Sequence, residues 1–261
     1  MSSPAAETAT VAPGGAALRG KALVVTGGAR GLGRAIVEQA AREGARVHFL
    51  FHASAAAATT IVNMLDEEGH RVTGHACDVR DAAALALVLQ AIEEQEGRID
   101  GLVNNAGVNR PGLLLATPDE AMAEQLAVNL MAPMVASRAV LTGMIRRRSG
   151  VIVQIGSVAA SKPFRGQTVY AATKGALESF TRALAVEVAA RGVRVLCVAP
   201  GPVQTDMLAS ALDPEEARRR TPTGRIAEPV EVARLVTFLL SDAASAMTGV
   251  VVPADLGYSL G

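Results

Sequence analysis

The chain has 261 residues, half of them apolar and 19% charged, a balance that indicates a compact folded protein rather than a disordered one. Its 25 Lys and Arg residues equal its 25 Asp and Glu residues, so no excess charge points to a nucleic acid or a membrane surface as a partner. No apolar run reaches the length of a transmembrane helix, and we expect no membrane-spanning segment.

The first twenty residues are rich in Ala, Ser, Thr, Pro and Gly. They lack the basic start and the continuous apolar stretch of a signal peptide, and we therefore expect the protein in the cytoplasm. We interpret residues 1–20 as a flexible tail and residues 21–261 as one domain, because no linker or internal repeat divides them. The two cysteines, Cys77 and Cys197, lie in apolar segments and are expected to be small buried side chains in a reducing compartment.

From residue 21 onward, short β-branched apolar segments alternate with amphipathic ones. The first apolar run ends at Gly27-Gly28, and the helix that begins at Gly31 is ended by Gly44. This alternation predicts a Rossmann-type α/β domain, with about seven parallel strands and helices on both faces. We expect strands over 21–26, 46–51, 71–77, 102–103, 151–155, 193–198 and 249–253, and further helices over 55–68, 82–96, 118–147 and 168–190.

A glycine-rich turn, Thr26-Gly-Gly-Ala-Arg-Gly-Leu-Gly33, joins the first strand to the first helix. Parallel sheets bind ligands beyond the carboxyl ends of their strands, which is where this turn lies. Glycines let the backbone approach a pyrophosphate, and a helix N-terminus offers free N–H groups and a positive dipole end. The turn therefore predicts a nucleotide site, although glycine also serves ordinary tight turns.

Tyr170 and Lys174 lie four residues apart on a predicted helix, and Ser157 lies thirteen residues upstream of the tyrosine. Residues at this spacing share one helix face. An ammonium about 4 Å from the phenol, at an effective dielectric of ~20, is worth roughly 4 kcal/mol and would lower the tyrosine pKa by about three units. The alternative is a surface helix that carries Tyr and Lys by chance. The four histidines have no metal-ligand spacing, and no metal is expected.

Six motifs in order resemble the classical short-chain dehydrogenase/reductase family: the T-G-x-x-x-G-x-G loop at Thr26, the Asn104-Asn-Ala-Gly107 motif, Asn129, Ser157, the Tyr-x-x-x-Lys pair and Pro200-Gly201. The resemblance covers about residues 20 to 258. The whole pattern looks most like the β-ketoacyl-acyl-carrier-protein reductases of fatty acid and polyketide synthesis.

The resemblance implies hydride transfer between a nicotinamide and a carbonyl carbon. Tyr170 would protonate the forming alkoxide, Lys174 would lower the tyrosine pKa and bind the nicotinamide ribose, and Ser157 would hold the substrate oxygen. Asn129 would secure a water that links Lys174 to solvent, or would simply bond to local backbone.

The same resemblance assigns cofactor contacts. Asp78 would bind the adenine, Asn105 would line the cofactor and Thr205 would meet the nicotinamide amide. Their structural alternatives are a turn or cap, a backbone brace and a helix N-cap, respectively. The full set is Gly27, Arg30, Gly31, Leu32, Gly33, His52, Asp78, Val79, Asn105, Ala106, Gly107, Tyr170, Lys174, Pro200, Gly201, Val203 and Thr205.

The cofactor preference depends on the end of the second strand, Phe51-His-Ala-Ser54, which contains no carboxylate. An acidic residue there would bind the ribose 2′-hydroxyl of NAD and repel the 2′-phosphate of NADP. Arg30 supplies a cation in the glycine-rich turn, and His52 lies where NADP-preferring relatives often place an arginine. We therefore expect NADP(H) as the preferred cofactor, with NAD(H) possible.

The substrate is less constrained. The resemblance places a lid at residues 202–222, where Met207, Leu208, Ala211 and Leu212 either contact a hydrophobic substrate or pack internally. Arg146, Arg147, Arg148 and Arg191 correspond to places where the reductases meet an acidic carrier protein, but cations are also favoured at ordinary helix C-termini. The ending 253–258 resembles Val-Asp-Gly-Gly-Tyr with Leu256 in place of the first glycine.

The leading hypothesis is an NADPH-dependent ketoreductase acting on a β-ketoacyl or polyketide-like substrate. The alternatives are an alcohol or hydroxysteroid-type dehydrogenase of free small molecules, and a catalytically silent cofactor-binding scaffold. The resemblance also implies a homotetramer or dimer formed by the helices that flank the fifth strand. Their apolar residues equally fit packing on the sheet; they are Ala132, Val135, Ala136, Ala139, Ala176, Leu177, Phe180, Ala183 and Leu184.

Overall fold

A computed structural model describes residues 16–209 and 213–260 of the chain. Most of the predicted tail (residues 1–15) and Ala211 and Leu212 of the predicted lid lie outside the described residues. The described end of that tail is not flexible, because Leu18 is fully buried in the core and its N–H bonds to the carbonyl oxygen of Glu43. The described part forms one sheet of seven parallel strands, ordered β3-β2-β1-β4-β5-β6-β7, which confirms the predicted Rossmann-type fold. The strands are β1 Ala22–Thr26, β2 Arg46–Phe51, β3 Val72–Ala76, β4 Gly101–Asn104, β5 Gly150–Ile155, β6 Val193–Pro200 and β7 Val251–Ala254.

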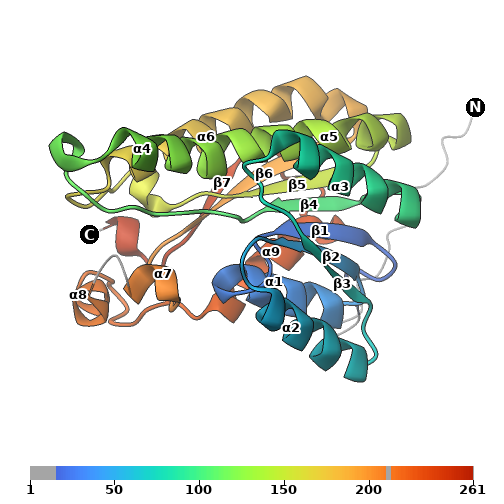
Figure 1. Ribbon diagram of the computed structural model, residues 1–261, viewed down its shortest axis with the longest axis horizontal. Helices are drawn as coiled ribbons and strands as arrows, with labels where there is room; N and C mark the ends of the chain where they lie inside the picture. Colours follow the sequence, from blue (N-terminus) through green and yellow to red (C-terminus); the bar gives the residue numbers. More distant parts are fainter. Residues whose placement is uncertain (1–15, 210–212, 261) are drawn as a thin grey trace, which may run out of the picture.

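Helices cover both faces of the sheet. Figure 1 shows α3 to α6 on one face and α1, α2 and α9 on the other. The longer helices are α1 Gly31–Arg42, α2 Ala55–Glu67, α3 Ala82–Glu96, α4 Asp119–Leu126, α5 Ala132–Arg147, α6 Thr168–Val188 and α9 Pro229–Leu240; α7 Asp206–Ala209 and α8 Pro214–Arg219 are short.

Every residue of β1 is buried, because side chains from successive positions enter different cores. Leu23 and Val25 pack with Phe49 beneath α1 and α9, whereas Val24 packs on the opposite face with the core beneath α3 and α5. Burial on both faces explains why the strands read as continuous apolar runs rather than as alternating ones.

The strand order reverses between β1 and β4, since β2 lies on one side of β1 and β4 on the other. Crossovers from these two strands leave in opposite directions and open a crevice at their carboxyl ends. The glycine-rich turn after β1 and the Asn-Asn-Ala-Gly segment after β4 therefore meet at this crevice.

The predicted helix over 118–147 is continuous, but its register changes at a π-helical turn, η2 Ala127–Met131, between α4 and α5. Such turns occur frequently at functional sites, and this one contains Asn129.

Within the described residues, the run Asp119–Arg147 is long and apolar enough to cross a membrane by length and composition, contrary to the expectation from sequence. Half of its most apolar window is buried in the fold, as in any core helix, so this is weak support for a membrane span.

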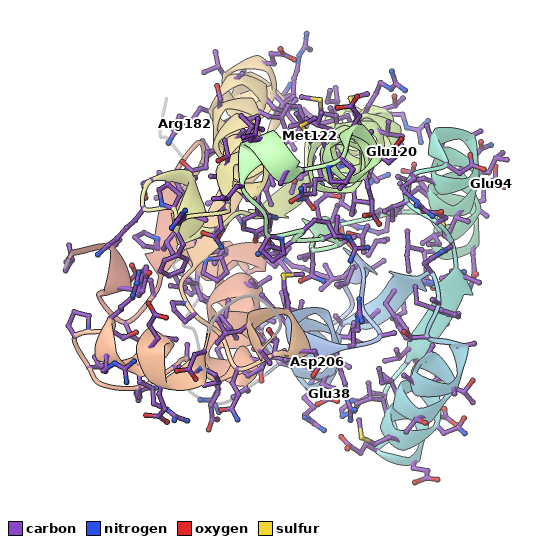
Figure 2. The ribbon with its side chains drawn as sticks, turned by 60° about the vertical axis from the view of Figure 1, so that its left-hand side comes forward. Glu38, Glu94, Glu120, Met122, Arg182 and Asp206 are labelled. Carbon is purple, nitrogen blue, oxygen red and sulfur yellow. The ribbon has the colours of Figure 1, made fainter. Side chains whose placement is uncertain are left out.

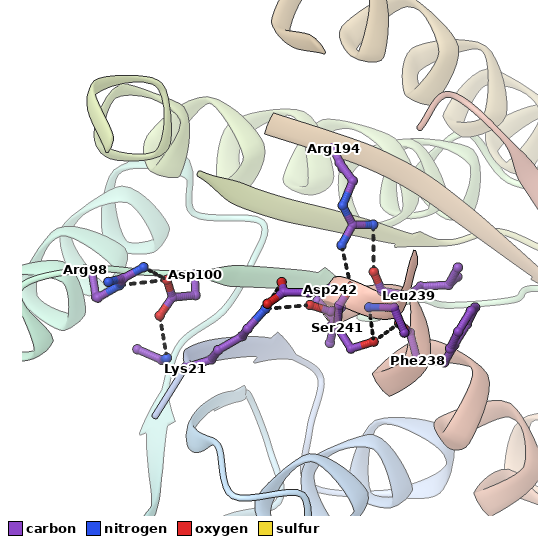
Figure 3. Close-up of polar contacts among 11 residues, drawn as sticks. Lys21, Arg98, Asp100, Arg194, Phe238, Leu239, Ser241 and Asp242 are labelled. Carbon is purple, nitrogen blue, oxygen red and sulfur yellow. Dashed lines mark hydrogen bonds and ion pairs between the residues drawn. The ribbon is translucent and has the colours of Figure 1, made fainter. Parts of the chain in front are cut away.

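The helix α9 was missing from the sequence-based prediction, although the signal for it was present. Pro229 occupies its first turn, and Glu228 and Glu231 form a capping box. Val232, Val236 and Leu239 are buried against the α1 side of the sheet. At the other end of α9, Arg194 donates to the carbonyl oxygens of Leu239 and Ser241, both at 2.9 Å (Figure 3). These bonds satisfy carbonyls that the helix leaves open.

Candidate active site

A cavity of about 790 Å³ lies at the carboxyl ends of the strands. All seventeen residues predicted to bind the cofactor line it, and so does Ser157. Asn129 does not line it, because this residue is fully buried behind the wall. In Figure 2, Asp206 of α7, another lining residue, lies on the opposite side of the sheet layer from Met122 of α4.

The glycine-rich turn is packed too closely for side chains. A Cβ added at Gly33 would lie 2.1 Å from the carbonyl oxygen of Gly27 and 2.4 Å from Nδ2 of Asn105. Gly27 and Gly31 also have positive φ angles, +68° and +52°, which favour glycine. Arg30, which precedes α1, makes no side-chain cap bond to the first turn of that helix. The first N–H groups of α1 therefore face the cavity as donors that fit a diphosphate.

Asn105 braces this turn from the end of β4. Its Nδ2 donates to the carbonyl oxygens of Thr26 (3.0 Å) and Gly27 (3.1 Å). The Thr26 hydroxyl in turn accepts bonds from the backbone N–H groups of Asn105 and Ala106, both at 3.0 Å. The side chain of Asn105 therefore braces the backbone of the turn, which is the structural alternative stated for it. The residue also lines the cavity.

Tyr170 is buried, and its burial raises the pKa of the phenol. A hydrogen bond with Ser157 acts in the opposite direction and is the smaller effect. The predicted fall in pKa caused by Lys174 is wrong for this geometry. The ammonium lies 5.7 Å from the centre of the Tyr170 ring, and the direction of the pKa shift is set by the loss of solvent around the phenol.

The ammonium of Lys174 is held by the backbone instead. Its Nζ donates to the carbonyl oxygen of Ile155, at the end of β5, over 2.7 Å. Burial lowers the pKa of Lys174 to about 8. Lys174 and Tyr170 nevertheless line the same cavity from one face of α6, as the spacing of four residues predicts.

Asn129 ties two parts of the site together. Its amide exchanges two bonds of 2.8 Å with the backbone of Val108, which lies 21 residues away in the loop after β4 and not in the helix that carries Asn129. The same amide donates to the Thr173 hydroxyl (3.2 Å), which donates to the carbonyl oxygen of Tyr170 (2.8 Å). The π-helical turn therefore supports the turn of α6 that carries Tyr170.

At the other end of the cavity, Asp78 is bound by a residue that sequence reasoning missed. The Arg80 guanidinium contacts both Asp78 oxygens at 2.6 to 3.0 Å and lowers the pKa of that carboxyl to about 2. His52 Nδ1 lies 3.9 Å from the same carboxylate. Arg80 follows Asp78 by two residues, but a single arginine in a loop carries no recognisable signal.

Thr205 directly precedes the short helix α7, and its hydroxyl accepts a long bond from the Leu208 N–H (3.4 Å). This contact fits the cap alternative, and Thr205 lines the cavity as well. Met207 and Leu208, the described apolar residues of the predicted lid, also line it.

A layered cluster that the sequence did not reveal contributes Lys162, Phe164 and Tyr258 to another part of the wall. The Lys162 ammonium lies 5.1 Å from the centre of the Tyr258 ring, and Phe164 meets that ring edge-on at 5.8 Å. The Arg220 guanidinium lies 4.7 Å from the centre of the Phe164 ring. These residues come from the loop before α6, the C-terminal turn and the end of α8, so only the fold brings them together.

The predicted carrier-binding and subunit residues are partly used within the chain. Arg147 donates to Glu93 (2.7 Å) and to the carbonyl oxygen of Ile99 (2.9 Å), whereas Arg146, Arg148 and Arg191 are exposed. Five of the nine residues proposed for a subunit face are buried within the chain and therefore pack on its core: Ala132, Val135, Ala136, Leu177 and Leu184.

Residues 27–259 match the protein family described as "Enoyl-(Acyl carrier protein) reductase". The chain is 39% identical to the human 3-oxoacyl-[acyl-carrier-protein] reductase, over 92% of this chain and 98% of that protein. It is 40% identical to the 3-oxoacyl-[acyl-carrier-protein] reductase of Vibrio harveyi, over 89% of this chain and 94% of that protein. Among solved structures, it resembles a short chain dehydrogenase from Burkholderia cenocepacia in complex with NADP, with a TM-score of 0.86, 34% identity and coverage of 92% and 98% of the two chains.

Proposed function

The chain belongs to the short-chain dehydrogenase/reductase family of oxidoreductases that act on CH–OH and C=O groups, and we propose that it reduces a β-ketoacyl thioester to the β-hydroxyacyl thioester with NADPH. The observation that carries the proposal is the meeting of Ser157, Tyr170 and Lys174 with the glycine-rich turn in one cavity. Relatives named as 3-oxoacyl-[acyl-carrier-protein] reductases support the thioester as substrate.

NADPH, when bound, supplies the hydride that reduces the carbonyl carbon. The Tyr170 phenol, kept protonated by burial, donates its proton to the oxygen as negative charge develops there. The Ser157 hydroxyl donates a second hydrogen bond to the same oxygen. Lys174, fixed on Ile155, faces this pair with its ammonium, and Asn129 holds the supporting turn through Thr173.

The decisive experiment follows NADPH and NADH oxidation with a β-ketoacyl thioester and with a panel of free ketones, for wild type and Tyr170→Phe. We expect NADPH-dependent turnover of the thioester, reduced by 10² to 10⁴-fold in the variant while NADPH still binds. Turnover of free ketones alone would replace the proposal with a small-molecule dehydrogenase. NADPH binding without turnover of any compound would favour the silent scaffold.

The proposed preference for NADP(H) rests on charge at the end of β2, where the strand itself supplies no carboxylate. The carboxylate nearest to His52 is Asp78, which follows the neighbouring strand β3 and is paired with Arg80. We expect Arg30→Ala to weaken NADPH binding by about 10-fold while changing NADH binding less than twofold, because only NADPH carries the 2′-phosphate. Equal affinity of the variant and wild type for NADPH would remove Arg30 from this role.

Assembly, location and carrier binding remain parts of the same proposal. We propose a homotetramer in the cytoplasm that receives its substrate on an acyl carrier protein. The exposed Arg146 and Arg191, rather than the internally paired Arg147, are the cations offered to the acidic carrier.

A further inference from the structure

Lys162 lies in the cavity wall five residues after Ser157, in the loop that precedes α6. Its side chain is half-buried, and its backbone N–H bonds to the carbonyl oxygen of Val158 over 2.7 Å. This bond fixes the lysine relative to the short helical turn that Ser157 begins, η3 Val158–Ala160. Lys162 therefore lines the same cavity as the proposed proton donor without belonging to the predicted catalytic set.

The ammonium is held in place by an aromatic residue that is itself rigid. Its Nζ donates to the carbonyl oxygen of Tyr258 (2.9 Å) and lies over the ring of that residue. Tyr258 is only 1% exposed and is packed against Phe164. An ammonium has three N–H donors, so the bond to the Tyr258 carbonyl oxygen leaves two for further acceptors.

The charge of Lys162 is unbalanced within the cavity. Two other lining cations pair with carboxylates, Arg80 with Asp78 and Arg110 with Glu124. Within residues 16–209 and 213–260, no carboxylate lies at ion-pair distance from Lys162 or from Arg30. Arg30 lies at the glycine-rich turn, where the proposed function places phosphates, and Lys162 lies near Ser157. A half-buried cation without a counter-charge fits an oxygen acceptor that arrives with the substrate.

We propose that Lys162 is a specificity residue that binds the thioester carbonyl oxygen of the substrate while Ser157 and Tyr170 hold the ketone oxygen. This inference rests on the proposed function and names the group that separates a β-ketoacyl thioester from a simple ketone. The two carbonyls of such a substrate are separated by one methylene, so both oxygens enter the same cavity. A charge-assisted bond to the second oxygen orients the first.

The test uses two substrates that differ by this oxygen alone. The first is the acetoacetyl thioester of N-acetylcysteamine, and the second is its thioether analogue, in which a methylene replaces the thioester carbonyl. We expect Lys162→Met to lower kcat/KM for the thioester by 10- to 100-fold, mainly through KM, and to change that for the thioether less than threefold. Lys162→Arg, which keeps the charge, should recover part of the loss.

Arg165→Met is the matched control, because Arg165 is an exposed cation of the same loop that does not line the cavity. It should leave both substrates unaffected. An equal loss on both substrates in Lys162→Met, or no loss on either, would overturn the role of Lys162 while leaving the proposed function intact. Wild-type enzyme that turns over the thioether but not the thioester would overturn the proposed function, and the inference with it.

Discussion

The Nζ of Lys174 donates to the carbonyl oxygen of Ile155 over 2.7 Å and lies 5.7 Å from the centre of the Tyr170 ring. The lysine is thus anchored on the end of β5, and it meets the tyrosine across the ring rather than through a direct bond to its hydroxyl. Burial acts on both groups, lowering the pKa of Lys174 to about 8 and raising that of Tyr170. Both shifts favour the uncharged forms, as desolvation requires.

We expect thioester reduction to decline as pH rises through about 8, where Lys174 loses its charge. A lysine at its ordinary pKa of 10.5 would stay charged near pH 8, and the rate of thioester reduction would not change there. The measurement is the pH profile of kcat/KM from pH 6 to 10 for wild type and Lys174→Arg. The guanidinium of the variant stays charged, so its kcat/KM should not decline with pH, however low its activity is. A decline that persists unchanged in Lys174→Arg would assign it to another group.

The same shift predicts a change in stability with pH. Because the folded pKa of Lys174 lies below its unfolded value, the unfolded state binds more protons between pH 8 and 10.5, and the free energy of unfolding rises with pH in this window. We expect wild type to gain up to about 3 kcal/mol relative to Lys174→Met across it. Urea unfolding at several pH values measures the difference, and parallel curves would contradict it.

Gly33→Ala should abolish tight cofactor binding, because its Cβ would strike the Gly27 carbonyl oxygen and the Asn105 amide that braces the turn. We expect at least a 10-fold rise in the Kd for NADPH and a loss of about 1–3 kcal/mol in stability. Gly175→Ala is the control on α6, since a Cβ there meets nothing within 4 Å. It should stabilise the protein by about 0.5–1 kcal/mol and leave NADPH affinity unchanged. Similar NADPH affinity in the two variants would refute the steric account of the turn.

The sheet and the glycine-rich turn were predictable because their signals are local. Buried parallel strands read as apolar runs, and the turn after β1 is dictated by close contacts that only glycine permits. The spacing of Tyr170 and Lys174 likewise follows from helix geometry alone. In these cases the local structure is determined by residues that are close together in the sequence.

The remaining features depend on distant partners. Lys162 is held by Tyr258, 96 residues away, and Lys174 bonds to a backbone oxygen that every residue possesses. The π-helical turn at Asn129 inserts one residue into an otherwise regular apolar pattern, which periodicity does not resolve. The predicted pKa fall of Tyr170 was wrong for a related reason, because burial is a property of the whole fold.

We expect Arg147 to stabilise the fold and Arg191 to bind the carrier protein. Arg147→Met removes the bonds to Glu93 and to the Ile99 carbonyl oxygen, and we expect a loss of about 1–3 kcal/mol without a change in KM. Arg191→Glu, on an exposed residue, should change stability by less than about 0.5 kcal/mol. It should raise KM several-fold for a carrier-bound substrate and not for the N-acetylcysteamine thioester. Unchanged KM for the carrier-bound substrate would remove Arg191 from the docking surface.

Leu256 carries backbone strain at the C-terminal turn. Its φ of +55° lies in the left-handed region, at the position where the family ending has glycine. This conformation costs a residue with a Cβ about 1–2 kcal/mol, and Leu256 offsets it by packing against the core beneath α1 and α9.

Two substitutions separate these contributions. Leu256→Ala loses the packing and keeps the strain, whereas Leu256→Gly loses both. We therefore expect the glycine variant to be more stable than the alanine variant by about 1 kcal/mol in urea unfolding, the reverse of their order in a helix interior. A more stable alanine variant would mean that the positive φ at this position costs no free energy. Leu256 would then contribute to stability through its packing contacts alone.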